Sequence, residues 1–484
     1  MLGFLVITEG FFMLASALVE FFYIKSGYDL FYLFNHNKGF SGLIISSAIT
    51  LVAGVILFLS TFKSSKKIGL REGFLIVSMV WIFFSIFGTL PLLFGGVTDN
   101  FTDAFFESMS GFTTTGLTIV EDVEVLPHSL LLWRSVTTWL GGMGIVVLSL
   151  AILPFLGVSN QLFLAESSRI SYSQIAPRIK DTARRLWGMY LLLTLILTIL
   201  LYLEGMSIFD AVNHGLTTMA SGGYSTKNAS IGYWHSPLIH YTIVVFMIIS
   251  GINFTLMYFA IFQRNFSKLF KDEEFRTFIW IIIVFTVSIF IVNFLPINTM
   301  HSASDFERNF RESIFQTVSA ISTTGYTITN DTPLTSFTLL SCVLLLFSGA
   351  CAGSTTSGMK IIRVLITVKN CFYEFRRLMH PNAVLPLKIN NKAVPNSTVM
   401  NVYAFMFLFV FFILFGTAAL MFDGLTIKEA LVMSISSVSN NTCLPIGSFP
   451  LATVSKWVIS FLMLIGRLEF FTIILLFVPD LWKK

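Results

Sequence analysis

The sequence predicts an all-α polytopic membrane protein in which four helix–re-entrant pore loop–helix repeats surround a central pore and follow an extra N-terminal helix pair. Three observations support this fold class. Of the 484 residues, 55% are hydrophobic and only 12% are charged. Apolar runs of about twenty residues, long enough to cross a bilayer, recur along the chain. A mixed apolar and polar stretch also returns four times between such runs, and repetition at this scale dictates the architecture.

The apolar runs predict roughly ten spanning segments. The first is interpreted as a retained helix, because it is too long and too poorly preceded by positive charge for a cleaved signal peptide. The predicted segments are 2–24, 41–62, 72–96, 130–156, 186–204, 237–262, 277–297, 337–362, 398–422 and 454–479.

Lysine and arginine cluster after every second predicted segment. The clusters lie at 63–71, 178–185, 264–276, 360–377 and 483–484. Basic loops stay on the cytoplasmic side of a membrane, so this alternation predicts that both termini are cytoplasmic. Because the basic residues do not form one patch, we expect no nucleic-acid partner. Membrane lipid is the expected surrounding partner.

The repeats divide the chain into five predicted parts. These are a two-helix extension (1–63), pore repeat 1 (64–180), pore repeat 2 (181–270), pore repeat 3 (271–392) and pore repeat 4 (393–484).

Four similar stretches connect the two long helices of each repeat. They read DAFFESMSGFTTTG (103–116), DAVNHGLTTMASGG (210–223), ESIFQTVSAISTTG (312–325) and EALVMSISSVSNNT (429–442). Each begins with an acidic residue, which favours the start of a helix. The apolar part is too short to span a bilayer, so a re-entrant helix is predicted in each repeat.

Each re-entrant helix is followed by a short polar run. In three of the four repeats a glycine closes this run, and glycine permits the positive φ angles that align successive carbonyl groups along a narrow pore. A single such run would indicate an ordinary extracellular loop, but four copies at one offset indicate a cation filter. The predicted K⁺-binding residues are Thr114, Thr115, Gly116, Ser221, Gly222, Gly223, Thr323, Thr324, Gly325, Asn440, Asn441 and Thr442.

Five motifs resemble a known family. They are SMSGFTTTGLT (108–118), WLGGMGIVVLSLAILP (139–154), ISTTGYT (321–327), GACAGSTTSGMKIIR (349–363) and GRLEFFTI (466–473). The chain resembles the Trk/Ktr/HKT superfamily of potassium transporters, and within it the bacterial TrkH pore-forming subunits. The resemblance implies a homodimer with one pore per protomer, in the bacterial cytoplasmic membrane. It also implies a cytoplasmic ring of TrkA-type nucleotide-binding regulators, K⁺ as the transported ion, and no cofactor.

The eighth apolar segment is interrupted by ten small or polar residues. Such a run breaks a transmembrane helix and leaves backbone groups that must face protein or water. Composition alone allows either a mobile gate or close helix packing; the resemblance favours a gating loop. Its residues are Gly349, Ala350, Cys351, Ala352, Gly353, Ser354, Thr355, Thr356, Ser357 and Gly358.

Arg467 is predicted to lie deep in the last helix, where a charge is costly and usually faces the protein interior. A spacing of two residues puts Glu469 on another helix face, so we expect no pairing between the two. The resemblance implies that Arg467 lies just below the filter and holds carbonyl groups of the gating loop. The alternative is a structural or snorkelling arginine.

Several other residues carry less specific signals. We interpret the acidic residues near the first repeat mainly as solvated loop charges and helix caps, with attraction of cations as the alternative; they are Asp99, Asp103, Glu107, Glu121, Asp122 and Glu124. The four cysteines lack metal-ligand spacing and are interpreted as small buried residues. No phosphate-binding GxxxxGK[ST] motif or nucleophile–base set is visible, which counts against an ATP-driven pump or an enzyme.

The fourth polar run lacks its glycine. The count that reaches glycine in the other repeats reaches Thr442 here, with Cys443 next to it, and Gly447 is too far along to replace it. Threonine at positive φ is an outlier. The fourth run is therefore expected either to store strain or to turn its carbonyl away, leaving the threonine hydroxyl to replace it. Potassium uptake is the leading prediction, and poorly selective K⁺/Na⁺ or Na⁺ transport is the alternative.

Overall fold

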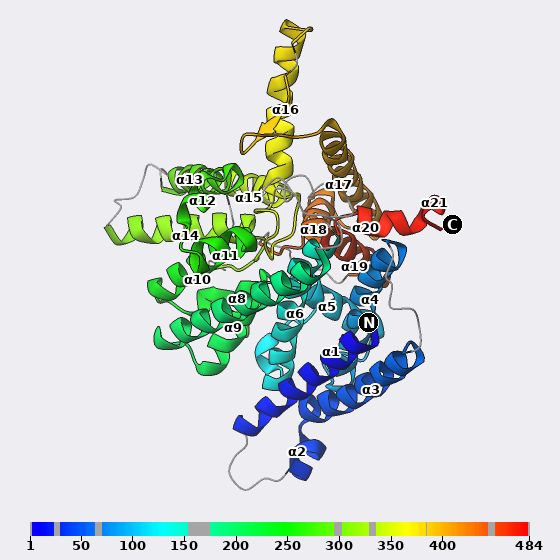
Figure 1. The fold of residues 1–484 in the computed structure, drawn as a ribbon. Helices are drawn as coiled ribbons and strands as arrows, with labels where there is room; N and C mark the ends of the chain where they lie inside the picture. Colours follow the sequence, from blue (N-terminus) through cyan, green and yellow to red (C-terminus); the bar gives the residue numbers. More distant parts are fainter. Residues whose placement is uncertain are drawn as a thin grey trace.

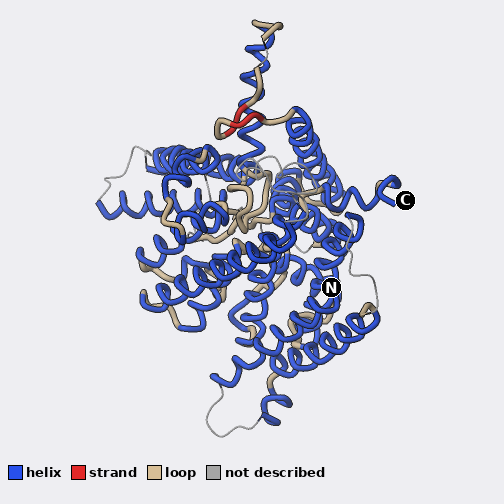
Figure 2. The backbone as a smooth tube through the Cα atoms, viewed as in Figure 1, coloured by secondary structure: helices blue, strands red, loops and turns tan. Residues whose placement is uncertain are grey.

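The computed structural model describes residues 2–23, 30–62, 70–152, 175–294, 303–328, 335–383, 385–443 and 451–482. In these ranges the regular secondary structure is helical apart from one short antiparallel hairpin, β1 (Lys388–Ile389) with β2 (Lys392–Ala393), and loops connect the elements (Figure 2). Gly447 lies outside the described residues.

The N-terminal extension is a packed pair of helices. It consists of α1 (Leu2–Ala17), which continues as a 3-10 helix to Tyr23, a short α2 (Leu30–His36) and α3 (Lys38–Ser60). A Cβ added to Gly3 would lie 2.5 Å from the backbone nitrogen of Phe58, so only glycine lets α1 and α3 approach this closely. The pair rests against α4 and α6 (Figure 1).

Four helix–short helix–helix units follow. The outer helices are α4 (Leu70–Phe94), α8 (Ile175–Leu203), α13 (Glu273–Phe294) and α17 (Asn396–Phe422). The re-entrant helices are α5 (Phe101–Phe112), α9 (Ile208–Ala220), α14 (Ala303–Ile321) and α18 (Ile427–Ser439). The inner helices are α6 (His128–Ile152), α10 (Pro237–Gly251), α15 (Ser336–Ser348) and α19 (Thr453–Arg467). Because α8 begins at Ile175, the predicted boundary after residue 180 falls inside a helix.

The units close into a ring. In every unit the re-entrant helix packs against its own outer and inner helices. It also packs against the inner helix of the preceding unit: α9 on α6, α14 on α10, α18 on α15, and α5 on α19. The last of these contacts joins the fourth unit back to the first, so the four re-entrant helices surround one axis.

The re-entrant helices begin where local capping chemistry dictates. The side chain of Asn100 accepts a hydrogen bond from Thr102 N at the start of α5, and that of Ser207 accepts one from Asp210 N in α9. Thr426 and Glu429 form a reciprocal capping box at the start of α18. These hydrogen bonds with Thr426 also lower the pKa of Glu429.

The third re-entrant helix begins earlier than predicted. It starts at Ala303 with Asp305 in its first turn, so Glu312 lies within the helix and not at its start. Glu312 pairs instead with Arg308 one turn earlier, at 2.9 Å. The acidic residue that marks helix starts in the other repeats is therefore not equivalent here.

Three of the four inner segments are broken, two more than predicted. The sixth apolar segment, predicted as one helix, bends by 109° between α10 and α11 (Phe254–Phe262). The last bends by 103° after Arg467, where Glu469 and Phe470 have positive φ angles before α20 (Phe471–Ile474). The eighth breaks as predicted, from the end of α15 to the start of α16 (Ile361–Met379).

Among the described residues, six helices are long and apolar enough to cross a membrane, or eight when each bent pair counts as one span. The other two predicted segments correspond to α6 and to the broken α15–α16. The α16 helix projects from the body of the molecule, with the hairpin beside it (Figure 1). The remaining short helices are α12 (Phe266–Lys271) and α21 (Pro479–Trp482), with 3-10 turns at Val123–Val125, Ser230–Tyr233 and Leu475–Phe477.

Candidate functional site

Four polar segments, 114–116, 221–223, 323–325 and 440–442, follow the re-entrant helices and meet at the axis of the ring. A Cβ added to Gly116 would overlap the carbonyl oxygen of Gly222, and one added to Gly223 would overlap that of Thr324. Segments 1 and 2, and segments 2 and 3, therefore touch through a glycine of one and a carbonyl oxygen of the next. Glycine is required at both positions because of this close approach.

The backbone of the polar segments alternates in a regular way. The first residue of each has a left-handed conformation: φ is 56° at Thr114, 58° at Ser221, 52° at Thr323 and 51° at Asn440. The glycine two residues later is also left-handed, with φ of 79°, 70° and 85° in segments 1 to 3. The two β-branched residues among them, Thr114 and Thr323, are strained positions, which are common at functional sites.

Thr442 departs from this alternation, because its φ is not positive. Of the two alternatives for the missing glycine, left-handed strain at Thr442 is therefore wrong. A Cβ added to Gly325 would collide with the hydroxyl oxygen of Thr442. At Gly116 and Gly223 the colliding atom is instead a backbone carbonyl oxygen. The same hydroxyl would lie 3.2 Å from a Cβ on Gly116. Segment 4 thus reaches segments 3 and 1 and completes the ring.

Two asparagine side chains fix segment 4 in place. Asn440 Nδ2 donates to Thr115 Oγ1 at 2.9 Å and to the carbonyl oxygen of Met463 at 2.9 Å. Asn441 Nδ2 donates to the carbonyl oxygen of Ala320 at 3.1 Å, at the end of α14. Both asparagines are fully buried. Their amides link segment 4 to the first and third units, as polar groups in a dry interior must be linked.

The tyrosines that follow Gly223 and Gly325 connect neighbouring units. The Tyr326 hydroxyl hydrogen-bonds Thr217 Oγ1 of α9 at 2.5 Å, and the Tyr224 hydroxyl donates to the carbonyl oxygen of Glu107 in α5 at 3.0 Å. Segments 2 and 3 are therefore each anchored to the re-entrant helix of the preceding unit.

The predicted gating loop, 349–358, lies directly against two polar segments. Ser357 N donates to Thr323 Oγ1 at 3.0 Å, and the hydroxyls of Thr355 and Ser221 are 2.9 Å apart. Thr355, Thr356 and Ser357 are buried. The loop therefore lies in direct contact with segments 2 and 3.

Arg467, at the end of α19 in the fourth unit, holds this loop in place. Its Nη1 donates to the carbonyl oxygen of Thr355 at 3.0 Å and to Ser357 Oγ at 2.7 Å, and its Nη2 donates to the carbonyl oxygen of Gly141 at 3.0 Å. The side chain is fully buried, and it lies at the end of α19 and not within a continuous helix. Glu469 does not pair with it, as predicted, and forms its ion pair with Arg363.

The first half of the loop is paired with the break between α10 and α11. Cys351 N donates to the carbonyl oxygen of Gly251, and Phe254 N donates to that of Gly353, both at 3.1 Å. The carboxylate of Glu274 accepts from Ala352 N at 2.7 Å. Two breaks thus satisfy each other's backbone groups, which a membrane interior requires.

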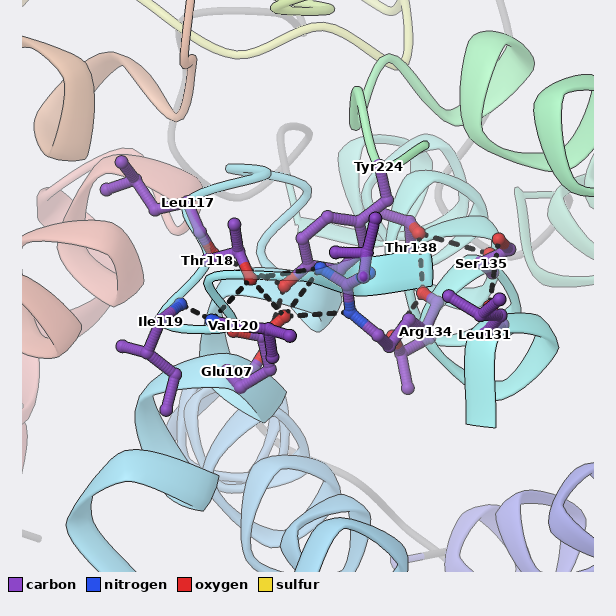
Figure 3. Close-up of polar contacts among 12 residues, drawn as sticks. Glu107, Leu117, Thr118, Ile119, Val120, Leu131, Arg134, Ser135, Thr138 and Tyr224 are labelled. Carbon is purple, nitrogen blue, oxygen red and sulfur yellow. Dashed lines mark hydrogen bonds and ion pairs between the residues drawn. The ribbon is translucent and has the colours of Figure 1, made fainter. Parts of the chain in front are cut away.

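Sequence reasoning missed a buried ion pair behind segment 1. Glu107, expected among the solvated acids, is 2% exposed and lies 2.8 Å from Arg134 of α6 (Figure 3). The i,i+4 spacing from Asp103 places Glu107 one turn into α5, but the sequence gives no signal for its partner. Cys371 is exposed, contrary to the expectation that all four cysteines are buried. In the described ranges, no three acidic, histidine or cysteine side chains gather as a metal site.

Comparison with known proteins gives matches over nearly the whole chain. Residues 41–484 match the TrkH family, described as a cation transport protein. The Trk system potassium uptake protein TrkH of Escherichia coli (strain K12) is 37% identical over 446 residues, which cover 90% of this chain and 91% of that protein. TrkG of the same strain, also a Trk system potassium uptake protein, is 32% identical over 492 residues, covering 100% and 98%. The crystal structure of the potassium transporter TrkH from Vibrio parahaemolyticus aligns with a TM-score of 0.87 and 32% identity, over 99% of this chain and 98% of that one.

Proposed function

Because the chain belongs to the TrkH family of cation transport proteins, we propose that it carries potassium into a bacterial cell across the cytoplasmic membrane. Relatives that match nearly its whole length are named potassium uptake proteins. The observation that carries the proposal is the ring in which four polar segments meet at one axis. Backbone carbonyl and hydroxyl oxygens in such a ring replace the water around a dehydrated monovalent cation.

The polar segments form the ion filter in this proposal, with K⁺ bound by residues 114–116, 221–223, 323–325 and 440–442. The left-handed residues that alternate along these segments support this role. Positive φ angles at such positions align successive carbonyl groups along a narrow pore. The re-entrant helices end just before the segments and direct their partly negative C-terminal ends towards the axis.

The 349–358 loop is the gate in this proposal, and Arg467 holds it closed. The hydrogen bonds from Arg467 to the loop, and from the loop to segments 2 and 3, support the assignment. A charge buried at membrane depth usually marks an ion pathway, and a positive charge there also repels cations while the loop is in place.

A second candidate function is poorly selective K⁺/Na⁺ or Na⁺ transport. The observation that favours it is Thr442, whose hydroxyl stands where a carbonyl oxygen stands at the other interfaces. A ring with one freely rotating hydroxyl has a less fixed size than a ring of four backbone carbonyls.

The remaining features complete the proposal. In this proposal the chain is divided into the five predicted parts, except that the boundary between repeats 1 and 2 is placed before α8. The protein acts as a homodimer with cytoplasmic TrkA-type nucleotide-binding regulators, a role consistent with relatives that are named as parts of a Trk system. Both termini are cytoplasmic, as the basic clusters indicate.

The experiment that tests the proposal is ion flux into liposomes that contain only this protein, with K⁺, Rb⁺ and Na⁺ compared side by side. Potassium flux that exceeds sodium flux is the expected result. Equal fluxes would favour the second candidate, and ATP-dependent accumulation would contradict both.

A further inference from the structure

A buried ion pair supports the first polar segment from behind. Glu107 Oε1 accepts hydrogen bonds from Arg134 Nε at 2.8 Å and from Thr118 Oγ1 at 3.1 Å, and its Oε2 accepts from Ile119 N at 3.0 Å (Figure 3). Arg134 Nη2 also donates to Thr118 Oγ1 at 3.1 Å. The residues just beyond Gly116 are therefore held to the re-entrant helix and to α6 together.

The same pair reaches the second polar segment through Tyr224, the residue after Gly223. The Arg134 guanidinium lies 4.2 Å from the centre of the Tyr224 ring, and the Tyr224 hydroxyl donates to the carbonyl oxygens of Glu107 and Leu117 at 3.0 and 3.4 Å. The ion pair thus fixes the positions of two adjacent segments relative to each other, at the interface where Gly116 touches Gly222.

The other units use the equivalent position differently. Glu107, His214, Gln316 and Met433 each lie nine residues before the last residue of their polar segment. His214 Nε2 hydrogen-bonds Ser225 Oγ at 3.0 Å, and Gln316 Nε2 donates to the carbonyl oxygen of Cys443 at 3.3 Å. In units 1 to 3 a polar side chain therefore holds a segment from behind, and only the first unit uses a charge.

We propose that Glu107 and Arg134 are positioning residues that set the ion discrimination of the ring; this rests on the proposed function of the polar segments. Selection between K⁺ and Na⁺ depends on how firmly the oxygen ligands hold their spacing and number. A buried arginine–carboxylate pair whose guanidinium also lies over a tyrosine ring is a rigid support. Loss of one partner leaves an uncompensated charge that the surroundings must move to solvate. Segments 1 and 2 provide half of the ring, so their displacement changes its size.

The test is the ratio of K⁺ to Na⁺ flux in proteoliposomes for Glu107→Gln, which keeps the shape of the side chain and removes its charge. We expect the ratio to fall about tenfold, which corresponds to about 1.4 kcal/mol of lost discrimination. Tyr224→Phe, which removes only the hydroxyl that bridges segments 1 and 2, should lower the ratio in the same direction. The matched control is Glu312→Gln on α14, which breaks a partly exposed pair with Arg308 and should leave the ratio unchanged.

The ratio separates positioning from a general structural role, because loss of folding lowers yield and total flux for both ions alike. Folded Glu107→Gln and Tyr224→Phe proteins with the wild-type ratio would overturn the inference. If Glu107→Gln does not fold, Tyr224→Phe decides the question. A wild-type protein that carries neither ion would instead overturn the proposed function, and this inference with it.

Discussion

Replacing Thr442 with valine tests whether a side-chain hydroxyl serves as an ion ligand in the fourth polar segment. Valine has nearly the same shape and the same β-branch, and Thr442 does not have the positive φ that a β-branched residue resists. Within the described ranges the hydroxyl has no hydrogen-bond partner, and the residue is half-buried, like Gly116 and Gly223. The substitution therefore removes one oxygen at the ring and little else.

The size of the effect follows from the contacts of that oxygen. The hydroxyl occupies the place at Gly325 that carbonyl oxygens occupy at Gly116 and Gly223. A polar contact with a full charge contributes about 1.5–3 kcal/mol, and each 1.4 kcal/mol is a factor of ten. Thr442→Val should thus lower potassium flux by roughly ten- to a hundredfold. Thr442→Gly should instead raise the ratio of K⁺ to Na⁺ flux, because glycine permits the left-handed conformation found in the other three segments.

The assay is uptake of K⁺, Rb⁺ and Na⁺ into proteoliposomes that contain the wild type or either variant at equal protein content. Wild-type potassium flux and K⁺/Na⁺ ratio in Thr442→Val would refute the ligand role of the hydroxyl. An unchanged ratio in Thr442→Gly would mean that the missing glycine is a tolerated local variation. Thermal unfolding of each variant in detergent checks that any loss of flux is not a loss of folded protein.

Three other predictions concern the gate and the packing around it. Arg467→Gln should raise flux roughly tenfold or more in the absence of regulators, since each lost hydrogen bond from a charged donor contributes about 1.5–3 kcal/mol; wild-type flux would contradict the gate. A partial deletion in the 349–358 loop should also raise flux, and lower flux in a folded protein would count against its role. Gly141→Ala should lower the unfolding temperature, because its Cβ would overlap the carbonyl oxygen of Phe112 and overpacking costs about 1–3 kcal/mol. The control is Gly144→Ala on the same helix, where the nearest atom would be 3.4 Å away; equal unfolding temperatures would show that the site relaxes.

The three broken inner segments have a common physical basis. A helix that breaks at membrane depth exposes backbone groups, and these are satisfied here by another break or by a buried side chain. The α10–α11 break pairs with the 349–358 loop, and the loop's second half pairs with Arg467 beside the α19–α20 break. Movement of the loop therefore requires several hydrogen bonds to open together, which is the kind of two-state element that a gate needs.

The amino-acid sequence by itself determined the repeated architecture and the residues at its centre. Apolar length and the small polar runs are local properties that recur in each repeat, so they predict the re-entrant helices and polar segments without knowledge of distant contacts. The acidic residue marked the helix start in three repeats but not in the third, where the helix begins at Ala303. The interruption at 349–358 was predictable for the same reason, since three glycines and four hydroxyl residues cannot continue an apolar span.

Only the tertiary structure decided how these parts are joined. Arg467 donates a hydrogen bond to Gly141, which is 326 residues away in the sequence, and Arg363 forms an ion pair with Glu469, which is 106 residues away. The sixth segment reads as a continuous helix because its residues favour one, and it breaks because the loop of another unit supplies partners for its free backbone groups. The sequence also left the backbone conformation of Thr442 open, because that conformation depends on which neighbouring segment its hydroxyl contacts. Local pattern specifies an element, but a buried charge or an open backbone group is stable only beside its partner, and the partner is known only after the chain has folded.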